Sequence, residues 1–183
     1  MSAEPVPSSL FLRNRQRACL LDRGLLRQIV LSLLNESLAL RNFDLGFFLV
    51  GDAEMTRLNE TFLHHAGSTD VITFNYLEEP GRGAVHGEIF ICTAEAIRQA
   101  LRFRTSWQEE LVRYVIHGLL HLQGYDDLQS PARQSMKRRE NKLVREVAKR
   151  FKLTALGKTR AHGVQESKTS RREKNHPGGF ASA

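Results

Sequence analysis

The sequence contains few residues that could stabilise it covalently. Its 183 residues include only two cysteines, Cys19 and Cys92, which lie far apart in apolar surroundings and lack Cys-x-x-Cys spacing. Cysteines in this pattern are more typical of buried thiols than of a disulfide or a metal site. We therefore expect a protein of a reducing cytoplasm, without a disulfide framework.

Long hydrophobic runs are also missing. No apolar stretch approaches the ~20 residues that a membrane-spanning helix needs. The first nine residues are polar, include Pro5 and Pro7, and lack the basic and apolar regions of a signal peptide. At this length, and without internal repeats, we expect one domain. The sequence predicts a cytoplasmic monomer that binds neither a membrane nor a nucleotide cofactor.

Acidic residues are scarce in one part of a chain whose net charge is +7. Residues 131–153 hold nine Lys and Arg but only two Asp and Glu, so pairing within a helix cannot neutralise them. A solvated helix face is one explanation, but a surface that contacts the phosphates of RNA is favoured. The residues expected to bind RNA are Arg133, Lys137, Arg138, Lys142, Arg145 and Lys149.

Hydrophobic periodicity predicts four strands and five helices. Strands are expected at residues 10–12, 43–50, 71–76 and 85–92, and helices at 23–39, 53–63, 93–103, 107–123 and 131–151. Asp22, Asp52, Thr93 and Ser106 are the expected helix caps. This order predicts an α/β (α+β) fold, a small mixed four-stranded sheet packed with about five helices. The domain is expected at 10–153, between a flexible terminus at 1–9 and a basic disordered tail at 154–183.

The strongest functional signal is the stretch from His117 to Asp127, which reads HGLLHLQGYDD. Two histidines four residues apart lie on the same face of a helix, so both rings can converge on one ion. Gly124 is suited to end that helix, and the following turn brings aspartates back under the same face. Two imidazoles and the carboxylate of Asp127 would form a zinc site with an open fourth position.

Other interpretations of this stretch are possible. A histidine pair at helical spacing often serves packing alone, and Asp126 could take the place of Asp127. A small metallopeptidase is disfavoured because the general base that follows the first histidine in such enzymes is replaced by Gly118.

These residues resemble the YbeY family of metal-dependent endoribonucleases. The family signature has the same histidine spacing, then Gly-Tyr-Asp and a third histidine, whose place is taken here by Asp127. A second block, at residues 69–74 (TDVITF), is similar to the family as well, and Gly87-Glu88-Ile89 stands where the family usually has Gly-Asp-Ile. The resemblance covers residues 10–153. It implies a cytoplasmic endoribonuclease that carries one zinc ion on a central helix and acts on ribosomal RNA.

The resemblance also marks departures from the family. An arginine is implied seven residues before Asp70, but Leu63 is present, with Arg57, His64 and His65 as the candidates to compensate for it. Asp70 and Glu88 are candidate bases or hydrogen-bond partners of the metal ligands, and a carboxylate ligand would lower the Lewis acidity of the ion. The sequence thus predicts a zinc-dependent, single-strand-specific endoribonuclease of ribosome maturation. The alternative is a catalytically impaired, metal-stabilised protein that binds RNA or the ribosome.

Overall fold

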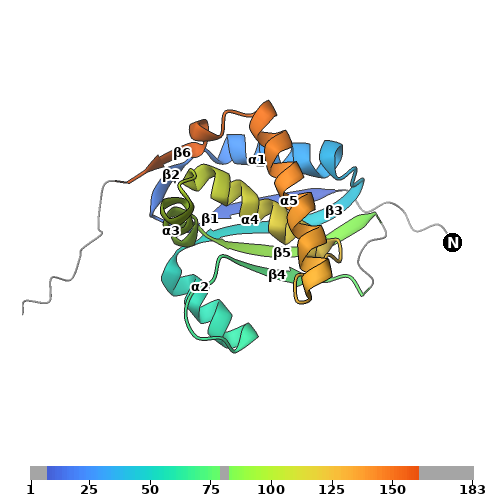
Figure 1. Cartoon of the computed structure of the whole chain (residues 1–183), viewed down its shortest axis with the longest axis horizontal. Helices are drawn as coiled ribbons and strands as arrows, with labels where there is room; N and C mark the ends of the chain where they lie inside the picture. Colours follow the sequence, from blue (N-terminus) through green and yellow to red (C-terminus); the bar gives the residue numbers. More distant parts are fainter. Residues whose placement is uncertain (1–7, 79–82, 161–183) are drawn as a thin grey trace, which may run out of the picture.

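The computed structural model describes residues 8–78 and 83–160. Within these residues the chain forms five α-helices and six strands (Figure 1). The strands are β1 (Ser9–Asn14), β2 (Cys19–Leu21), β3 (Asn42–Val50), β4 (Val71–Asn75), β5 (Ala84–Cys92) and β6 (Gly157–Thr159). The helices are α1 (Arg23–Ser32), α2 (Asp52–Leu58), α3 (Thr93–Phe103), α4 (Trp107–Leu122) and α5 (Ser130–Arg150). Shorter turns are η1 (Leu33–Ser37), η2 (Asn59–Leu63) and η3 (Leu153–Leu156).

A mixed four-stranded sheet lies at the centre, with the strand order β1-β3-β5-β4. Strands β1, β3 and β5 are parallel, and β4 pairs antiparallel to β5 at one edge. Helices α1, α4 and α5 belong to the larger hydrophobic cluster on one face, whereas Met55 and Leu58 of α2 pack on the other. The α/β fold with a mixed four-stranded sheet and five helices is therefore confirmed.

Helix α4 is the most buried helix of the protein. Its apolar residues point both to the sheet and to α5, which lies across it (Figure 1). Gly118 allows the close approach to β5, because a Cβ atom there would lie 2.7 Å from Cγ2 of Ile89. Strands β4 and β5 thus form the floor under the histidine-bearing helix.

Two of the four predicted helix caps are wrong. Asp22 accepts a hydrogen bond from the amide of Leu25, and Ser106 accepts one from the amide of Glu109, as expected for N-caps. In contrast, α2 begins at Asp52 itself, and Thr93 is the first residue of α3 and donates to the carbonyl of Val50. Threonine and aspartate favour helix starts, but this preference does not distinguish the cap from the first turn.

Both predicted domain boundaries need correction. Ser9 belongs to β1, and the chain stays ordered beyond residue 153 through η3 and β6. Leu156 is fully buried, and β6 pairs antiparallel with β2. The hydrophobic pattern of the sequence did not predict this segment, because a single apolar residue, Leu156, anchors it. The remaining parts of the predicted termini, at 1–7 and 161–183, lie outside the described residues.

Both cysteines are free and buried, as predicted. Burial raises the pKa of Cys19 to about 11, so its thiol stays protonated and inert near neutral pH. Among the described residues, no helix combines the length and the apolar character that crossing a bilayer requires.

Candidate metal centre

Helix α4 holds His117 and His121 one turn apart, with their ring planes at 80° to each other. Their Nε2 atoms are 3.0 Å apart, and both side chains are partly buried. The helix is fixed by its Ser106 cap and by apolar packing on both sides, so the two rings are held by a rigid element. Two nitrogen ligands are therefore positioned toward one point.

A turn after α4 brings Asp127 to the same point. Gly124 has a φ angle of +87°, and its amide donates to the carbonyl of His121. This left-handed conformation, which glycine adopts without steric cost, reverses the chain. Asp127 Oδ2 then lies 3.8 Å from Nε2 of His117 and 3.9 Å from Nε2 of His121. Asp126 instead accepts a hydrogen bond from the amide of Leu128.

The dimensions of this triad suit a small divalent cation. The three ligand atoms all lie within 4.8 Å of one another. Tetrahedral ligands at about 2.0–2.1 Å from zinc are separated by about 3.3 Å. The separations of 3.0, 3.8 and 3.9 Å bracket this value, so small side-chain movements would suffice. The triad could therefore hold a metal ion, as the histidine spacing predicted.

The outer nitrogens of both rings have acceptor partners. Nδ1 of His117 is 3.1 Å from Oε2 of Glu140, and Nδ1 of His121 is 3.1 Å from the carbonyl oxygen of Tyr125. An ionised carboxylate and a carbonyl only accept hydrogen bonds, so each Nδ1 carries the proton. The lone pair of each neutral ring is then on Nε2, directed at the shared point, which is the arrangement that metal-binding histidines use.

Glu140 connects the triad to α5. Its carboxylate also accepts hydrogen bonds from Arg113 at 2.8 Å and from Lys137 at 2.9 Å. Burial raises the pKa of this carboxyl, but the hydrogen bonds from His117, Arg113 and Lys137 outweigh that effect and lower the pKa to about 2. Glu140 is thus an ionised acceptor at neutral pH, although its side chain is almost fully buried.

The two histidines have opposite pKa shifts. Burial lowers the pKa of His117, but its hydrogen bond to Glu140 and the charge of that residue outweigh burial and raise the pKa. Burial and the neighbouring charge of His117 lower the pKa of His121. Without a cation, the pair therefore takes up at most one proton readily, because two positive charges 3.0 Å apart repel each other.

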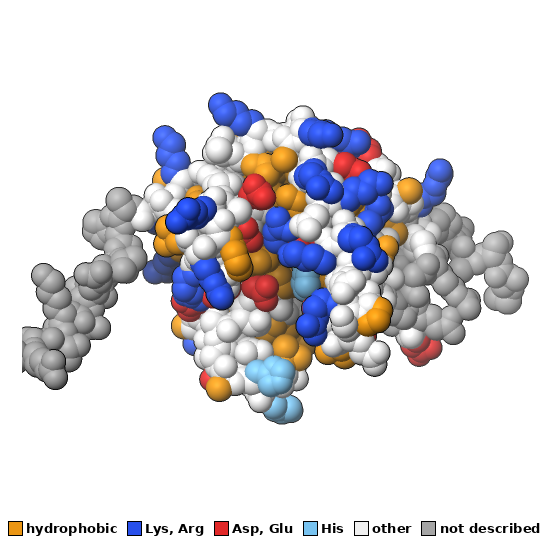
Figure 2. All heavy atoms as spheres, viewed as in Figure 1, with side chains coloured by type: hydrophobic (Ala, Val, Ile, Leu, Met, Phe, Trp, Pro, Cys, Tyr) orange, Lys and Arg blue, Asp and Glu red, His pale blue; other side chains and the backbone are white. Residues whose placement is uncertain are grey.

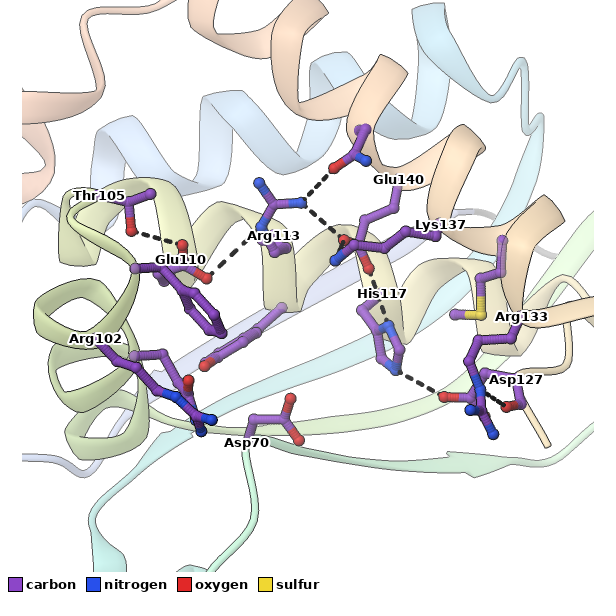
Figure 3. Close-up of a pocket in the computed structure, with 15 residues that line it drawn as sticks. Asp70, Arg102, Thr105, Glu110, Arg113, His117, Asp127, Arg133, Lys137 and Glu140 are labelled. Carbon is purple, nitrogen blue, oxygen red and sulfur yellow. Dashed lines mark hydrogen bonds and ion pairs between the residues drawn. The ribbon is translucent and has the colours of Figure 1, made fainter. Parts of the chain in front are cut away.

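The triad lies beside an open cleft of about 700 Å³ between α3, α4 and α5 (Figure 3). Figure 3 shows Arg102 and Thr105 at one end of the cleft, and Asp127 with Arg133 at the other. His117 faces the cleft between these ends, so an ion on the triad would be accessible to a ligand in the cleft.

The structure separates the two predicted accessory acids. Asp70 lines the cleft, where its Oδ1 accepts hydrogen bonds from the Val71 amide and the Thr69 hydroxyl. The predicted role of Glu88 is wrong. Its carboxylate accepts a hydrogen bond from the hydroxyl of Tyr76, on the sheet face opposite α4. Successive strand residues point to opposite faces, and Gly87, next to it, is the one that faces α4 through Leu122. Glu88 therefore cannot reach the triad.

The position of the family arginine also lies away from the cleft. Leu63 is in η2 with 45% of its surface exposed. Of the described residues that line the cleft, none is Leu63, Arg57, His64 or His65. The suggested compensation by these three side chains has no support in this arrangement.

Only two of the six residues predicted to bind RNA line the cleft, namely Arg133 and Lys137. An α-helix turns by about 100° per residue, so the other four lie on a separate stripe of α5. This stripe is rotated by roughly 130° about the helix axis from Arg133 and Lys137. This stripe consists of Arg138, Lys142, Arg145 and Lys149, and all four are exposed. Figure 2 shows Lys and Arg side chains gathered over α5 beside the hollow of the cleft.

Sequence reasoning missed Glu140, Arg113 and the end of α3. A signal for Glu140 existed, since it continues the apolar stripe of Met136, Leu143 and Val147 at positions i, i+4, i+7 and i+11. An acid on a stripe that faces the core indicates a buried partner. Arg102 and Phe103 had no such signal, because only the packing of α3 against α4 brings them to the cleft.

Comparison with known proteins identifies the family of this chain. The sequence model of a family described as Endoribonuclease YbeY matches residues 12–148. The chain belongs to the YbeY family. A YbeY relative from Salinibacter ruber, named Endoribonuclease YbeY, is 32% identical over 149 residues, which cover 77% of this chain and 93% of the relative.

Further YbeY relatives align over shorter regions. The Chlorobaculum tepidum protein, also named Endoribonuclease YbeY, is 43% identical over 91 residues, which cover 50% of this chain and 64% of that protein. A solution structure of TM1509 from Thermotoga maritima superimposes with a TM-score of 0.59 at 27% identity, covering 79% of this chain and 92% of that one. The YbeY fold thus extends over most of the described residues.

Proposed function

We propose that this chain is an endoribonuclease that uses one zinc ion, held by His117, His121 and Asp127, to cleave single-stranded RNA during ribosomal RNA maturation in the cytoplasm. The observation that carries the proposal is the convergence of three ligand atoms within 4.8 Å of one another at a cleft. The family match and the names of the relatives support the reaction class. The choice of zinc follows from the donor set of two imidazoles and one carboxylate.

The chain's own residues prepare the site for this chemistry. A metal ion bound there would polarise a phosphoryl oxygen and lower the pKa of a water molecule. Glu140 and the Tyr125 carbonyl keep the two rings in the tautomer that leaves Nε2 free. Asp70 lines the cleft and accepts both of its hydrogen bonds through Oδ1. Its other carboxylate oxygen can therefore accept a proton from the attacking group, which is a water molecule or a ribose 2′-hydroxyl.

The proposal is tested by cleavage of RNA. The zinc-loaded protein and a His117→Ala variant are incubated with single-stranded RNA, with structured RNA and with casein. We expect the wild type to cleave single-stranded RNA faster than structured RNA. The cleavage rate of the variant should be lower by at least about 100-fold. Peptide products would indicate a metallopeptidase instead.

One observation favours a second outcome. The residue at the position of the family arginine is Leu63, and the three candidates to replace it, Arg57, His64 and His65, do not line the cleft. Tight RNA binding without any metal-dependent products would therefore support the alternative, a metal-stabilised RNA- or ribosome-binding protein.

A further inference from the structure

The cleft continues beyond the metal centre to the end of α3, where Arg102 and Phe103 line it. Phe103 exposes 60% of its surface, and the guanidinium carbon of Arg102 lies 5.4 Å from its ring centroid. A large aromatic residue on the wall of a polar cleft, beside a cation, is the combination that binds single-stranded nucleic acids.

The charges of the cleft show which cations are available for a ligand. Its lining includes four Lys or Arg side chains and four carboxylates. Arg113 and Lys137 are both paired with Glu140. Among the described residues, neither Arg102 nor Arg133 makes an ion pair with a carboxylate, and Arg133 donates to the backbone carbonyls of Asp127 and Leu128. Arg102 is thus the cation that remains free at the end remote from the triad.

The spacing along α4 relates this end to the metal centre. The hydroxyl of Thr105, two residues after Phe103, donates to Glu110 at 2.7 Å. Glu110 precedes His117 by seven residues, which correspond to about 10 Å along a helix. One single strand can therefore reach from the metal centre to this end of the cleft.

We propose that Arg102 and Phe103 form a subsite for one nucleotide of a single-stranded RNA whose scissile phosphate lies at the metal centre. Phe103 stacks on the base, and Arg102 contacts a neighbouring phosphate. The inference rests on the proposed function, because it assigns the substrate strand of the same cleft. It also gives a reason for single-strand preference, since a base must be unpaired and unstacked to lie on Phe103.

The test measures binding of a short fluorescent single-stranded RNA to the metal-loaded full-length protein by anisotropy, with the RNA checked on a gel for integrity. Phe103→Ala should weaken binding at least about fivefold, and Leu101→Ala should not. Leu101 is a matched control because it is in the same turn of α3 and is 79% exposed, but does not line the cleft.

Arg102 is tested through the salt dependence of binding. Arg102→Gln should reduce the slope of log affinity against log salt concentration by about 0.7, the contribution of one phosphate contact in a single strand. Phe103→Ala should leave that slope unchanged, because stacking involves no counterion release. The control is Arg104→Gln, which removes the same charge from a residue that does not line the cleft.

A set of RNAs, each with one abasic position, identifies the stacked nucleotide. At one position the removal of the base should weaken wild-type binding as much as Phe103→Ala does, and the variant should lose nothing further there. A Phe103→Ala effect that is absent, or that is equal at every abasic position, overturns the inference.

Cleavage is measured in parallel, so that the two proposals can fail separately. If the wild type cleaves the RNA but Phe103→Ala binds and cleaves normally, the subsite is refuted and the endoribonuclease stands. Binding that depends on Phe103 without cleavage supports the subsite and refutes the reaction. A wild type that does not bind RNA refutes both.

Discussion

Glu140 is the side chain that connects the histidine pair to the rest of the protein. It accepts hydrogen bonds from His117, Arg113 and Lys137 while almost fully buried. Groups that orient metal-binding histidines commonly affect metal affinity as strongly as some ligands do. The candidate metal centre therefore depends on α5 as well as on α4.

Replacing Glu140 by Gln should weaken both the fold and the metal site. The change removes the nearest of three carboxylates around Arg113, with Glu109 and Glu110 remaining at 3.5 and 3.6 Å, so we expect the free energy of unfolding to fall by about 1.5–3 kcal/mol, the value of hydrogen bonds to charged groups. The loss of the ionised acceptor for Nδ1 of His117 should weaken zinc binding by about 10-fold or more, because the amide oxygen of glutamine is a weaker acceptor. Chemical denaturation and zinc titration measure the two effects. Glu146→Gln on the same helix is the control, and a zinc affinity equal for both variants would contradict this role.

Glu140 also predicts a pH dependence of stability in the metal-free protein. Its pKa is about 2 in the folded protein, below the usual 4.5. Such a group stabilises the fold above its unfolded pKa, and this stabilisation is lost as the pH falls through the folded pKa. Between pH 4.5 and 2, unfolding measurements should therefore show a smaller loss of stability in Glu140→Gln than in the wild type. Parallel curves would rule out this carboxyl as a source.

At the scale of elements, α4 is the part of the protein that the sequence predicts best. Its Ser106 cap, its histidine spacing and the turn at Gly124 are all local signals, and they were sufficient to bring His117, His121 and Asp127 together. Glu88 was misplaced because the pleat of a strand, and not its nearness in sequence to Gly87, decides which face a side chain occupies. The cleft was not predictable, since it arises from the packing of three separate helices.

The segment after α5 shows how few residues can anchor an element. Leu156 is fully buried, and its carbonyl accepts a hydrogen bond from the amide of Asp22. The side chain of Gln108 in α4 also donates to the carbonyl of Gly157. This segment therefore links the two-stranded β2–β6 sheet to the helix that carries the metal ligands.

We expect Leu156→Ala to lower the free energy of unfolding by about 2–5 kcal/mol, the usual cost of emptying a buried leucine site. The exposed Leu101→Ala should change it by less than about 0.5 kcal/mol. Thermal or urea unfolding distinguishes the two. If both variants were equally stable, residues 154–160 would behave as the disordered tail that the sequence predicted.

At the scale of the whole molecule, positive charge is separated into two surfaces. The cleft contains equal numbers of cations and carboxylates, although Arg102 and Arg133 form no ion pair with the described residues there, whereas Lys and Arg side chains gather over α5 beside it (Figure 2). Direct contacts with the RNA in the cleft and electrostatic attraction of its phosphates by the stripe are physically different contributions to RNA binding. The sequence predicted the basic helix, but it could not show that its residues divide between two faces.

Changing Arg138, Lys142, Arg145 and Lys149 together to Gln should weaken binding to every RNA at low salt. The slope of log affinity against log salt concentration should decrease by up to about 3, since each single-strand phosphate contact contributes about 0.7. The cleavage rate at saturating RNA should remain unchanged, because the stripe lies outside the cleft. The control replaces four exposed arginines outside α5, namely Arg13, Arg17, Arg23 and Arg41. Equal slopes in both variants would refute a specific role for α5.

The most direct test of the account is the number of metal ions bound per chain. Purified protein, loaded with zinc and dialysed, should contain one ion per chain by elemental analysis. His121→Ala and Asp127→Ala should each contain far less, while circular dichroism shows that their helices are retained. One ion in the wild type that persists in both variants would contradict the claim that this triad holds the metal.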